Sequence, residues 1–304
     1  MNIGIDIGGS HIGIGLVTPD GKILKKVEKN ITENERKEIK VFLIQTIVNV
    51  LKNWEQEYDS AIVKIGIGIP GIVKNNVVEY SVNLGLNNWN LKSELQPFFP
   101  DTNISIKNDA KCAGLAEKKL GALQNYEDCI FICLGTGIGG AAFYKNELII
   151  PKRSSGFEFG HMILQRDGVS CRCGSQGCFE MYGSMRRFKS DIKQVMNIDK
   201  SIEGKELHDI VKSKIDSDYV KNVISGYVEN LCIGISNIID VLEPEAICIG
   251  GSFAYYEDVL LEKVREELCG SKYIFYKEDM PKIILASLGN DAGIIGSALY
   301  AKLN

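Results

Sequence analysis

Four side chains of the kinds that bind transition metals stand close together in the middle of the sequence. His161 is followed after nine residues by Cys171-Arg172-Cys173, and Cys178 comes five residues after Cys173, with glycines in between. One imidazole and three thiolates form the tetrahedral ligand set of a structural Zn²⁺ site, and close cysteine spacing is typical of a zinc knuckle. The sequence therefore predicts one zinc site made by His161, Cys171, Cys173 and Cys178.

Two glutamates flank these ligands. Glu158 lies three residues before His161, and Glu180 lies two residues after Cys178. Zinc on one ring nitrogen of His161 would leave the other to donate to a ligand hydroxyl, and the two carboxylates could accept from further hydroxyls. The alternative is that both glutamates are solvated surface acids.

Two glycine-rich segments, each directly after a strand-like run, could offer backbone N–H groups to phosphates. They are Asp6-Ile7-Gly8-Gly9-Ser10 and Gly135-Thr136-Gly137-Ile138-Gly139-Gly140. Glycine lets the backbone approach an anion closely, and a carboxylate such as Asp6 beside a phosphate suggests Mg²⁺. A plain hairpin turn is the alternative for the first segment. The second matches G-x-G-x-x-G, but a dinucleotide site is disfavoured because residues 138–144 look like a strand, not a helix.

A third candidate is Asn108-Asp109, where a strand over residues 104–107 turns into a helix over residues 108–120. Asp109 could take a proton from a substrate hydroxyl as that oxygen attacks a γ-phosphate. A helix N-cap is the alternative for this pair.

The elements that must position these residues repeat along the chain. Strands over 3–7, 12–17 and 22–28 precede a helix that begins at Thr32 with a capping box and runs to Trp54, followed by a strand over 61–67. Strands over 128–134, 138–144, 147–150 and 246–249 repeat the pattern. This predicts two related α/β lobes with mixed sheets and a cleft between them. We place one lobe at 1–118 and the other, with the knuckle, at 119–290, while a final helix at 291–304 folds back on the first.

Composition excludes several classes of protein. The 304 residues carry 35 basic and 39 acidic side chains, a net charge of −4, without a dense basic block, which argues against nucleic acid as a partner. We find neither a signal peptide nor a membrane span and expect a cytoplasmic protein. Outside the knuckle we expect the cysteines to be buried small hydrophobes, namely Cys112, Cys129, Cys133, Cys232, Cys248 and Cys269.

Taken together, the motifs resemble those of the ROK sugar kinases (repressors, open reading frames and kinases) of the actin-like ATPase superfamily, whose lobes have a ribonuclease H-like fold. The resemblance covers essentially the whole chain. It includes both glycine loops, Gly68-Ile-Pro-Gly71, Asn108-Asp-Ala and Ile249-Gly-Gly-Ser252. The segments Glu158-x-x-His161 and Cys171-x-Cys-Gly-x-x-Gly-Cys178-x-Glu180 resemble the family signature.

The resemblance implies transfer of the γ-phosphate of ATP to a hexose hydroxyl, commonly the 6-hydroxyl, with Asp109 as general base, Mg²⁺ on the nucleotide and a structural Zn²⁺. It assigns the sugar to Gly71, Asn108, Asp109, Glu158, His161 and Glu180. It assigns the nucleotide to Asp6, Gly8, Gly9, Ser10, His11, Gly135, Thr136, Gly137, Gly250 and Gly251.

The resemblance leaves the substrate open. Glucose is the leading candidate, and N-acetylmannosamine or N-acetylglucosamine is the alternative; a homodimer is expected. A sugar-sensing repressor is a different class, disfavoured because only two residues precede Ile3. Ser10-His11 stands where the family usually has Thr-Lys, so the loop lacks a permanent cation for the phosphate donor.

Overall fold

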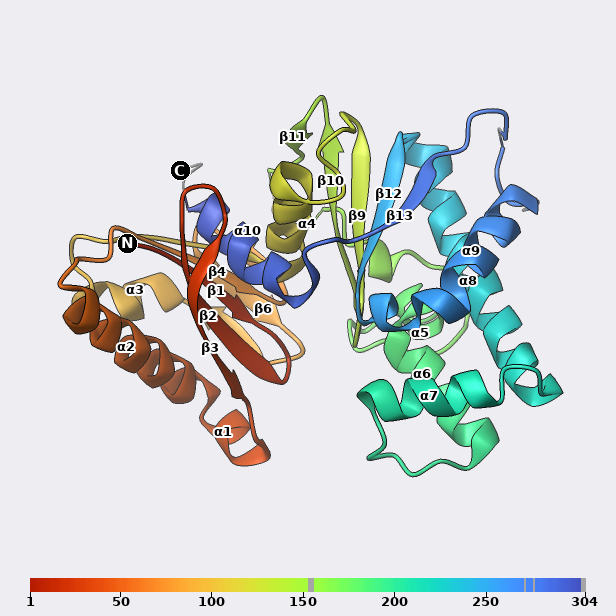
Figure 1. Cartoon of the computed structure of the whole chain (residues 1–304), viewed down its shortest axis with the longest axis horizontal. Coiled ribbons are helices and arrows are strands. Elements are labelled where there is room, and N and C mark those ends of the chain that lie inside the picture. The colour runs from red at the N-terminus through yellow and green to blue at the C-terminus, as the bar shows by residue number, and fades with distance from the viewer. Residues whose placement is uncertain (153–155, 271, 276, 302–304) are drawn as a thin grey trace. The chain divides into compact units, whose positions relative to one another are not determined.

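The computed structural model describes residues 1–152, 156–270, 272–275 and 277–301 (Figure 1). The chain divides into two compact units. Unit 1 comprises Met1–Gln124, Leu148–Gly156 and Asn290–Asn304, and unit 2 comprises Asn125–Glu147 and Phe157–Gly289. The boundary that we expected near residue 118 falls inside a helix of unit 1, so the first segment of this unit continues to Gln124.

Unit 1 is built on a mixed five-stranded sheet with the order β3-β2-β1-β4-β8. Strands β1 to β3 are antiparallel neighbours, whereas β4 pairs parallel with both β1 and β8. The strands are β1 (Asn2–Ile7), β2 (His11–Val17), β3 (Ile23–Asn30), β4 (Lys64–Ile69) and β8 (Asn103–Asn108). A small antiparallel sheet adds β5 (Ile72–Lys74), β6 (Val77–Ser81) and β7 (Leu86–Trp89).

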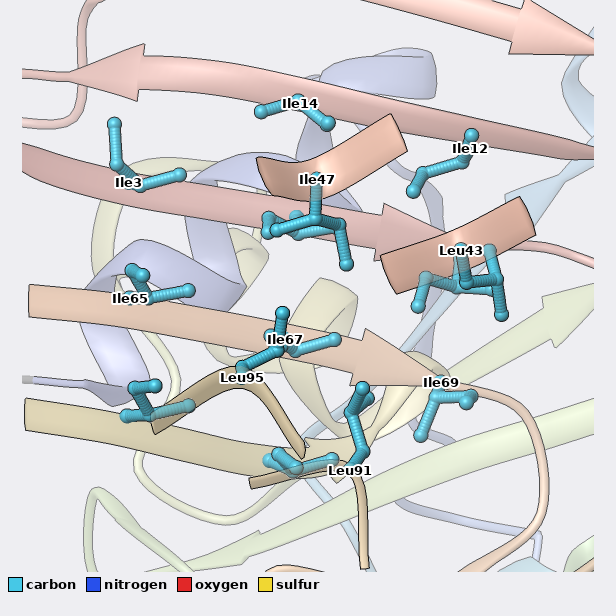
Figure 2. Packing of buried hydrophobic residues seen from close by; sticks show 14 of the residues in the cluster. Ile3, Ile12, Ile14, Leu43, Ile47, Ile65, Ile67, Ile69, Leu91 and Leu95 are labelled. Carbon is cyan, nitrogen blue, oxygen red and sulfur yellow. The ribbon is translucent and has the colours of Figure 1, made fainter. Parts of the chain in front are cut away.

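The alternation of isoleucine and glycine along β1 and β4 gives this sheet two different faces. Isoleucines at every second position form one apolar face, and Figure 2 shows them packed against side chains of α2 (Ile39–Tyr58) and α3 (Leu91–Leu95). Gly4 and Gly66 lie on the other face. A Cβ there would come within 1.9 Å of the Ile294 carbonyl oxygen and 1.8 Å of that of Ser297. The glycines thus let α10 (Ala292–Tyr300) lie directly on the sheet (Figure 1).

One of the remaining helices of unit 1 differs from the sequence prediction. The single helix expected from Thr32 to Trp54 is two helices, α1 (Glu33–Lys37) and α2, because the backbone at Glu38 leaves the helical region at φ −126° and ψ 44°. The capping box of Thr32 and Glu35 is present. Helix η1 (Gln96–Phe98) precedes β8, and α4 (Asp109–Leu120) follows it. Of the final helix expected over 291–304, residues 302–304 lie outside the described residues.

Unit 2 has a second mixed sheet with the order β11-β10-β9-β12-β13, the same arrangement as in unit 1. Its strands are β9 (Cys129–Leu134), β10 (Ile138–Tyr144), β11 (Glu147–Leu148), β12 (Ala246–Gly251) and β13 (Lys282–Leu285). Strand β10 is antiparallel to β9, and β12 is parallel to both β9 and β13. The predicted α/β class with two mixed sheets is confirmed.

The helices of unit 2 are mostly C-terminal to the knuckle. They are η2 (Phe159–His161), α5 (Glu180–Gly183), α6 (Met185–Met196), α7 (Gly204–Ser213), α8 (Asp218–Leu242), η3 (Ser252–Tyr256) and α9 (Glu257–Gly270), with η4 (Gly289–Asp291) leading into α10. None of the described helices is both long and apolar enough to cross a membrane. The prediction that the isolated cysteines are buried is wrong for Cys269, which is exposed on α9, and for Cys133, which is half-buried at the end of β9.

Candidate functional site

The four predicted metal ligands lie together in unit 2. One ligand atom from each of His161, Cys171, Cys173 and Cys178 lies within 4.8 Å of all the others. The Sγ atoms of Cys173 and Cys178 are 3.6 Å apart, and Nδ1 of His161 is 3.8 Å from Sγ of Cys171. One nitrogen and three sulfurs at these separations fit a tetrahedral Zn²⁺ ion.

Tight turns bring the cysteines to this point. The backbone N–H of Cys171 donates to the Ser175 carbonyl at 2.8 Å, and that of Gly174 donates to the Cys171 carbonyl at 3.0 Å. Gly177 has φ +76°, and a Cβ there would lie 1.7 Å from the Gln165 carbonyl oxygen, so only glycine fits before Cys178.

The thiols have unequal acidities. Burial raises the pKa of Cys178 to about 12. For Cys173 burial also acts against the thiolate, but hydrogen bonds from Ser175 and the neighbouring cysteines outweigh it and lower the pKa to about 7. A divalent cation would favour the thiolate form of all three cysteines.

Glu180 connects the knuckle to the second glycine loop. Its Oε2 accepts from the backbone N–H of Ile138 at 3.0 Å, and its Oε1 is 3.7 Å from the guanidinium of Arg186. Its side chain is only 17% exposed, so the solvated-acid alternative does not describe it. Glu158 lies directly before η2, where its carbonyl accepts from the N–H of His161 at 3.0 Å.

The second glycine loop lies at the edge of a cavity. Gly135, Thr136 and Gly137 form the turn between β9 and β10, closed by a 3.0 Å hydrogen bond from the Gly135 N–H to the Gly137 carbonyl. Gly250 and Gly251 lie alongside, because β12 pairs with the end of β9. Gly135, Thr136, Ser252 and residues of α6 line a cavity of about 820 Å³. This volume is typical of a small-molecule site.

The first glycine loop, in unit 1, is a tight hairpin between β1 and β2. The Gly8 N–H donates to the His11 carbonyl at 2.8 Å, and the His11 ring lies over Gly8, where a Cβ would come within 2.7 Å of it. Burial raises the pKa of Asp6, at the end of β1, to about 7. A cation such as Mg²⁺ beside this carboxyl would favour its ionised form.

Asn108 and Asp109 have different roles at the start of α4. The Asn108 side chain caps the helix by accepting from the Lys111 N–H at 3.1 Å, and its Nδ2 donates to the Gly71 carbonyl at 3.1 Å. Asp109 is the first helical residue, and its Oδ1 accepts from the Ala110 N–H at 2.8 Å. The capping function that the sequence left open for this pair therefore belongs to Asn108.

Asp6 and Asp109 both lie beside Gly68, at the carboxyl ends of the strands of the unit 1 sheet. Asp6 pairs with Gly68 across β1 and β4, and a Cβ on Gly68 would lie 3.3 Å from the Asp109 Cα. The carboxyl ends of parallel strands are where α/β sheets bind ligands.

Sequence reasoning missed two arginines beside the loops. Arg36 of α1 donates to the Gly9 carbonyl and, at 3.2 Å, to that of Asn83. Arg186 of α6 lines the cavity beside the second loop. Neither belongs to a motif. The pair Arg186-Arg187 lies in the first turn of α6, where basic residues are unfavourable, but no helix is predicted there from the sequence.

The fold and these sites define an actin-like member of the ROK kinase and repressor proteins, and the chain belongs to the ROK family, which it matches over residues 2–303. It is 29% identical to the glucokinase of Thermotoga maritima, covering 99% of this chain and 96% of that protein. It is 28% identical to the xylose repressor of Bacillus spizizenii over 97% of this chain but 75% of the repressor. The crystal structure of a ROK glucokinase from Streptomyces griseus, in complex with glucose and AMPPNP, superimposes with a TM-score of 0.84 at 26% identity, covering 100% of this chain and 99% of that one.

Proposed function

We propose that this protein is an ATP-dependent sugar kinase that transfers the γ-phosphate to a hexose hydroxyl, the 6-hydroxyl, with glucose as the leading substrate. The proposal rests on the observation that Asn108 and Asp109 have different roles at the start of α4. Because Asn108 caps the helix, the carboxylate of Asp109 is not needed for capping. A carboxylate at the ligand-binding edge of the sheet is suited to act as a general base.

In the proposed reaction Asp109 removes the proton of the sugar hydroxyl as its oxygen attacks the γ-phosphorus. The bond between that phosphorus and the bridging oxygen breaks, and ADP leaves with the electron pair. Asn108 and Gly71, joined by their hydrogen bond, orient the sugar. Apart from those of Gly8 and Gly135, which donate within their own turns, the N–H groups of each glycine loop are donors suited to phosphate oxygens. Asp6 would hold Mg²⁺, which supplies charge that neutralises phosphate when bound.

In unit 2, the knuckle would position the residues that bind the sugar. His161 would hold a zinc ion through one ring nitrogen, and its other nitrogen would then be oriented toward a sugar hydroxyl. Glu158 and Glu180, at the two ends of the knuckle, accept from further hydroxyls. A zinc ion held by these residues would be structural, since the protein supplies all four ligands.

Two other functions fit the family. A kinase for N-acetylmannosamine or N-acetylglucosamine would use the same residues on a different sugar. The similarity to a xylose repressor supports a non-catalytic sugar-sensing regulator as the second of these functions. The chain covers 75% of the length of that repressor and 96% of the length of the glucokinase, so the glucokinase is the fuller match. A cytoplasmic location and a homodimer remain predictions.

The test is a coupled ADP-release assay on the zinc-loaded protein with Mg²⁺ and ATP. The panel is glucose, fructose, mannose, allose, N-acetylglucosamine and N-acetylmannosamine. Turnover highest with glucose supports the leading proposal, and turnover highest with an N-acetylhexosamine supports the alternative kinase. Sugar binding by calorimetry without ADP release from any sugar would contradict the kinase and favour the regulator.

A further inference from the structure

Helix α6 begins with two positive charges at its positive end. Arg186 and Arg187 lie in its first turn after the N-cap Ser184, whose Oγ accepts from the Arg187 N–H at 3.3 Å. The N-terminus of a helix carries a partial positive charge, so cations there cost stability and a nearby anion regains it. The arrangement favours an anion close to this helix start.

The two arginines differ in their partners. Arg187 is compensated within its own helix, because its Nε donates to Asp191 at 2.6 Å, one turn later. Arg186 approaches Glu180 only to 3.7 Å, which is beyond hydrogen-bond distance. The other oxygen of Glu180 already accepts from Ile138. The charge of Arg186 is therefore less completely compensated than that of Arg187.

Arg186 is also fixed to the second glycine loop. Its backbone N–H donates to the Gly135 carbonyl at 3.1 Å, and together with Gly135 and Thr136 it lines the 820 Å³ cavity. Its side chain is 32% exposed, so it is held in place yet accessible to a ligand.

Three lysines also line this cavity, all C-terminal to Arg186: Lys189 and Lys193 of α6, and Lys200 after the helix. Lys189 and Lys193, one and two turns after Arg186, both bind Glu203, at 3.1 and 2.5 Å. Their hydrogen bonds lower the pKa of Glu203, although its burial acts in the opposite direction. Of these four cations, Arg186 is the one whose backbone is hydrogen-bonded to the second glycine loop.

We propose that Arg186 binds the phosphates of the nucleotide, as a positioning residue for phosphoryl transfer. Its planar guanidinium would donate two N–H groups to phosphate oxygens held by the loop of Gly135 to Gly137. The assignment rests on the proposed function, and it supplies a permanent cation that the first loop, with His11, lacks.

The experiment measures binding of ADP and of adenosine by calorimetry to the zinc-loaded protein with Mg²⁺. Arg186→Gln is expected to weaken ADP about 10- to 100-fold, because a charge-assisted pair is lost, while adenosine binding stays unchanged. Arg186→Lys should fall between wild type and Arg186→Gln, since it keeps the charge but not the fork. The matched control is Arg187→Gln, which should bind ADP like wild type. Thermal melting and zinc content of each variant establish that it is folded.

Three results would overturn the assignment. The first is an unchanged ADP affinity in folded Arg186→Gln. The second is an equal loss of ADP and adenosine affinity, which would place the effect on the nucleoside. The third is an equal loss in Arg187→Gln, which would mean that general charge on α6 is responsible. Failure of the wild-type protein to bind ADP at all would instead contradict the proposed function, and this assignment with it.

Discussion

Asp109 and Asn108 are adjacent residues that could each cap a helix, and the structure separates them. Asn108 accepts the cap hydrogen bond from the Lys111 N–H, so Asp109→Asn leaves this cap intact. The new side chain keeps an oxygen that can accept from the Ala110 N–H but loses the basic carboxylate. We predict that Asp109→Asn lowers kcat about 10²- to 10⁴-fold, the usual contribution of a positioned general base, while sugar and ADP still bind.

Steady-state kinetics and calorimetry on the same preparation check this prediction. Asp101→Asn, at an exposed aspartate before β8, is the control and should keep full activity. Near-normal kcat in folded Asp109→Asn would mean that the residue is not the base.

The knuckle offers a second prediction at the scale of single residues. We expect elemental analysis to find one zinc per chain, and Cys173→Ser to lose the metal, melt at lower temperature and turn over sugar more slowly. The losses belong together because His161 and Glu180 are placed by the same turns. Cys269→Ser, at an exposed cysteine of α9, is the control and should change neither metal content nor melting. A metal-free wild-type protein purified without chelators would refute the site.

What the sequence could predict at this scale depends on how local the signal is. The zinc ligands are recognisable because most of the site lies within a few residues of one turn. The contacts of Arg36 with the Gly9 carbonyl and of Glu180 with the Ile138 N–H join segments far apart in the chain. Their spacing carries no such information, so these contacts could be found only in the folded chain.

At the scale of elements, the apolar patterns predicted most strands and the repeated succession of strands along the chain. The observed strand boundaries differ from the predicted ones where backbone pairing sets the ends of a strand. The strand expected at 61–67 is β4, Lys64–Ile69, because pairing with β1 begins at Asn2 and Lys64. The break at Glu38 does not interrupt the helical spacing of the hydrophobic residues, because a single residue separates α1 from α2.

A cluster joining α7 to α9 predicts a pH-dependent stability. His208 is half-buried, with Nε2 2.9 Å from Asp258, Nδ1 3.2 Å from Asp209 and its ring against Tyr256. Lys212 also binds Asp258, at 2.7 Å. The hydrogen bond to Asp258, with help from Asp209, raises the pKa of His208 despite partial burial.

Because the folded state favours protonated His208, its stabilising effect is full below the unfolded pKa of about 6.5 and is lost as pH rises through the folded pKa. We therefore predict that His208→Gln lowers the free energy of unfolding at pH 5.5 by up to about 1 kcal/mol, a modest value because the pair lies near the surface, and by less at pH 9. Urea denaturation of both proteins at each pH measures this. A difference that is larger at pH 9 would show that the histidine acts when neutral.

At the scale of the whole molecule, the chain builds unit 1 from three separate segments. The last of them brings α10 back to the sheet formed by the first, where it contacts β1, β4 and α4 (Figure 1). The glycines of β1 and β4 are therefore a long-range requirement. Glycines destabilise strands locally, and here they contribute to stability only because residues more than two hundred positions later pack against them.

Gly66 in β4 allows this requirement to be tested. A Cβ at this position would lie 1.8 Å from the carbonyl oxygen of Ser297, a backbone atom that moves only if α10 moves. We predict that Gly66→Ala lowers the free energy of unfolding by about 3 kcal/mol, the upper range for overpacking a core. Gly226→Ala in α8 is the control, because among the described residues no atom lies within 4 Å of a Cβ there. It should stabilise the protein by about 0.5–1 kcal/mol through helix propensity.

Hydrogen exchange followed by mass spectrometry then locates the effect of Gly66→Ala. Peptides from β4 and α10 should exchange faster together, although they belong to different segments of unit 1, whereas peptides from α8 in unit 2 should exchange as in wild type. Faster exchange confined to β4 would mean that α10 does not depend on the glycine face. Equal acceleration in α8 would mean that the two units unfold as one, and the long-range requirement would then extend to the entire chain.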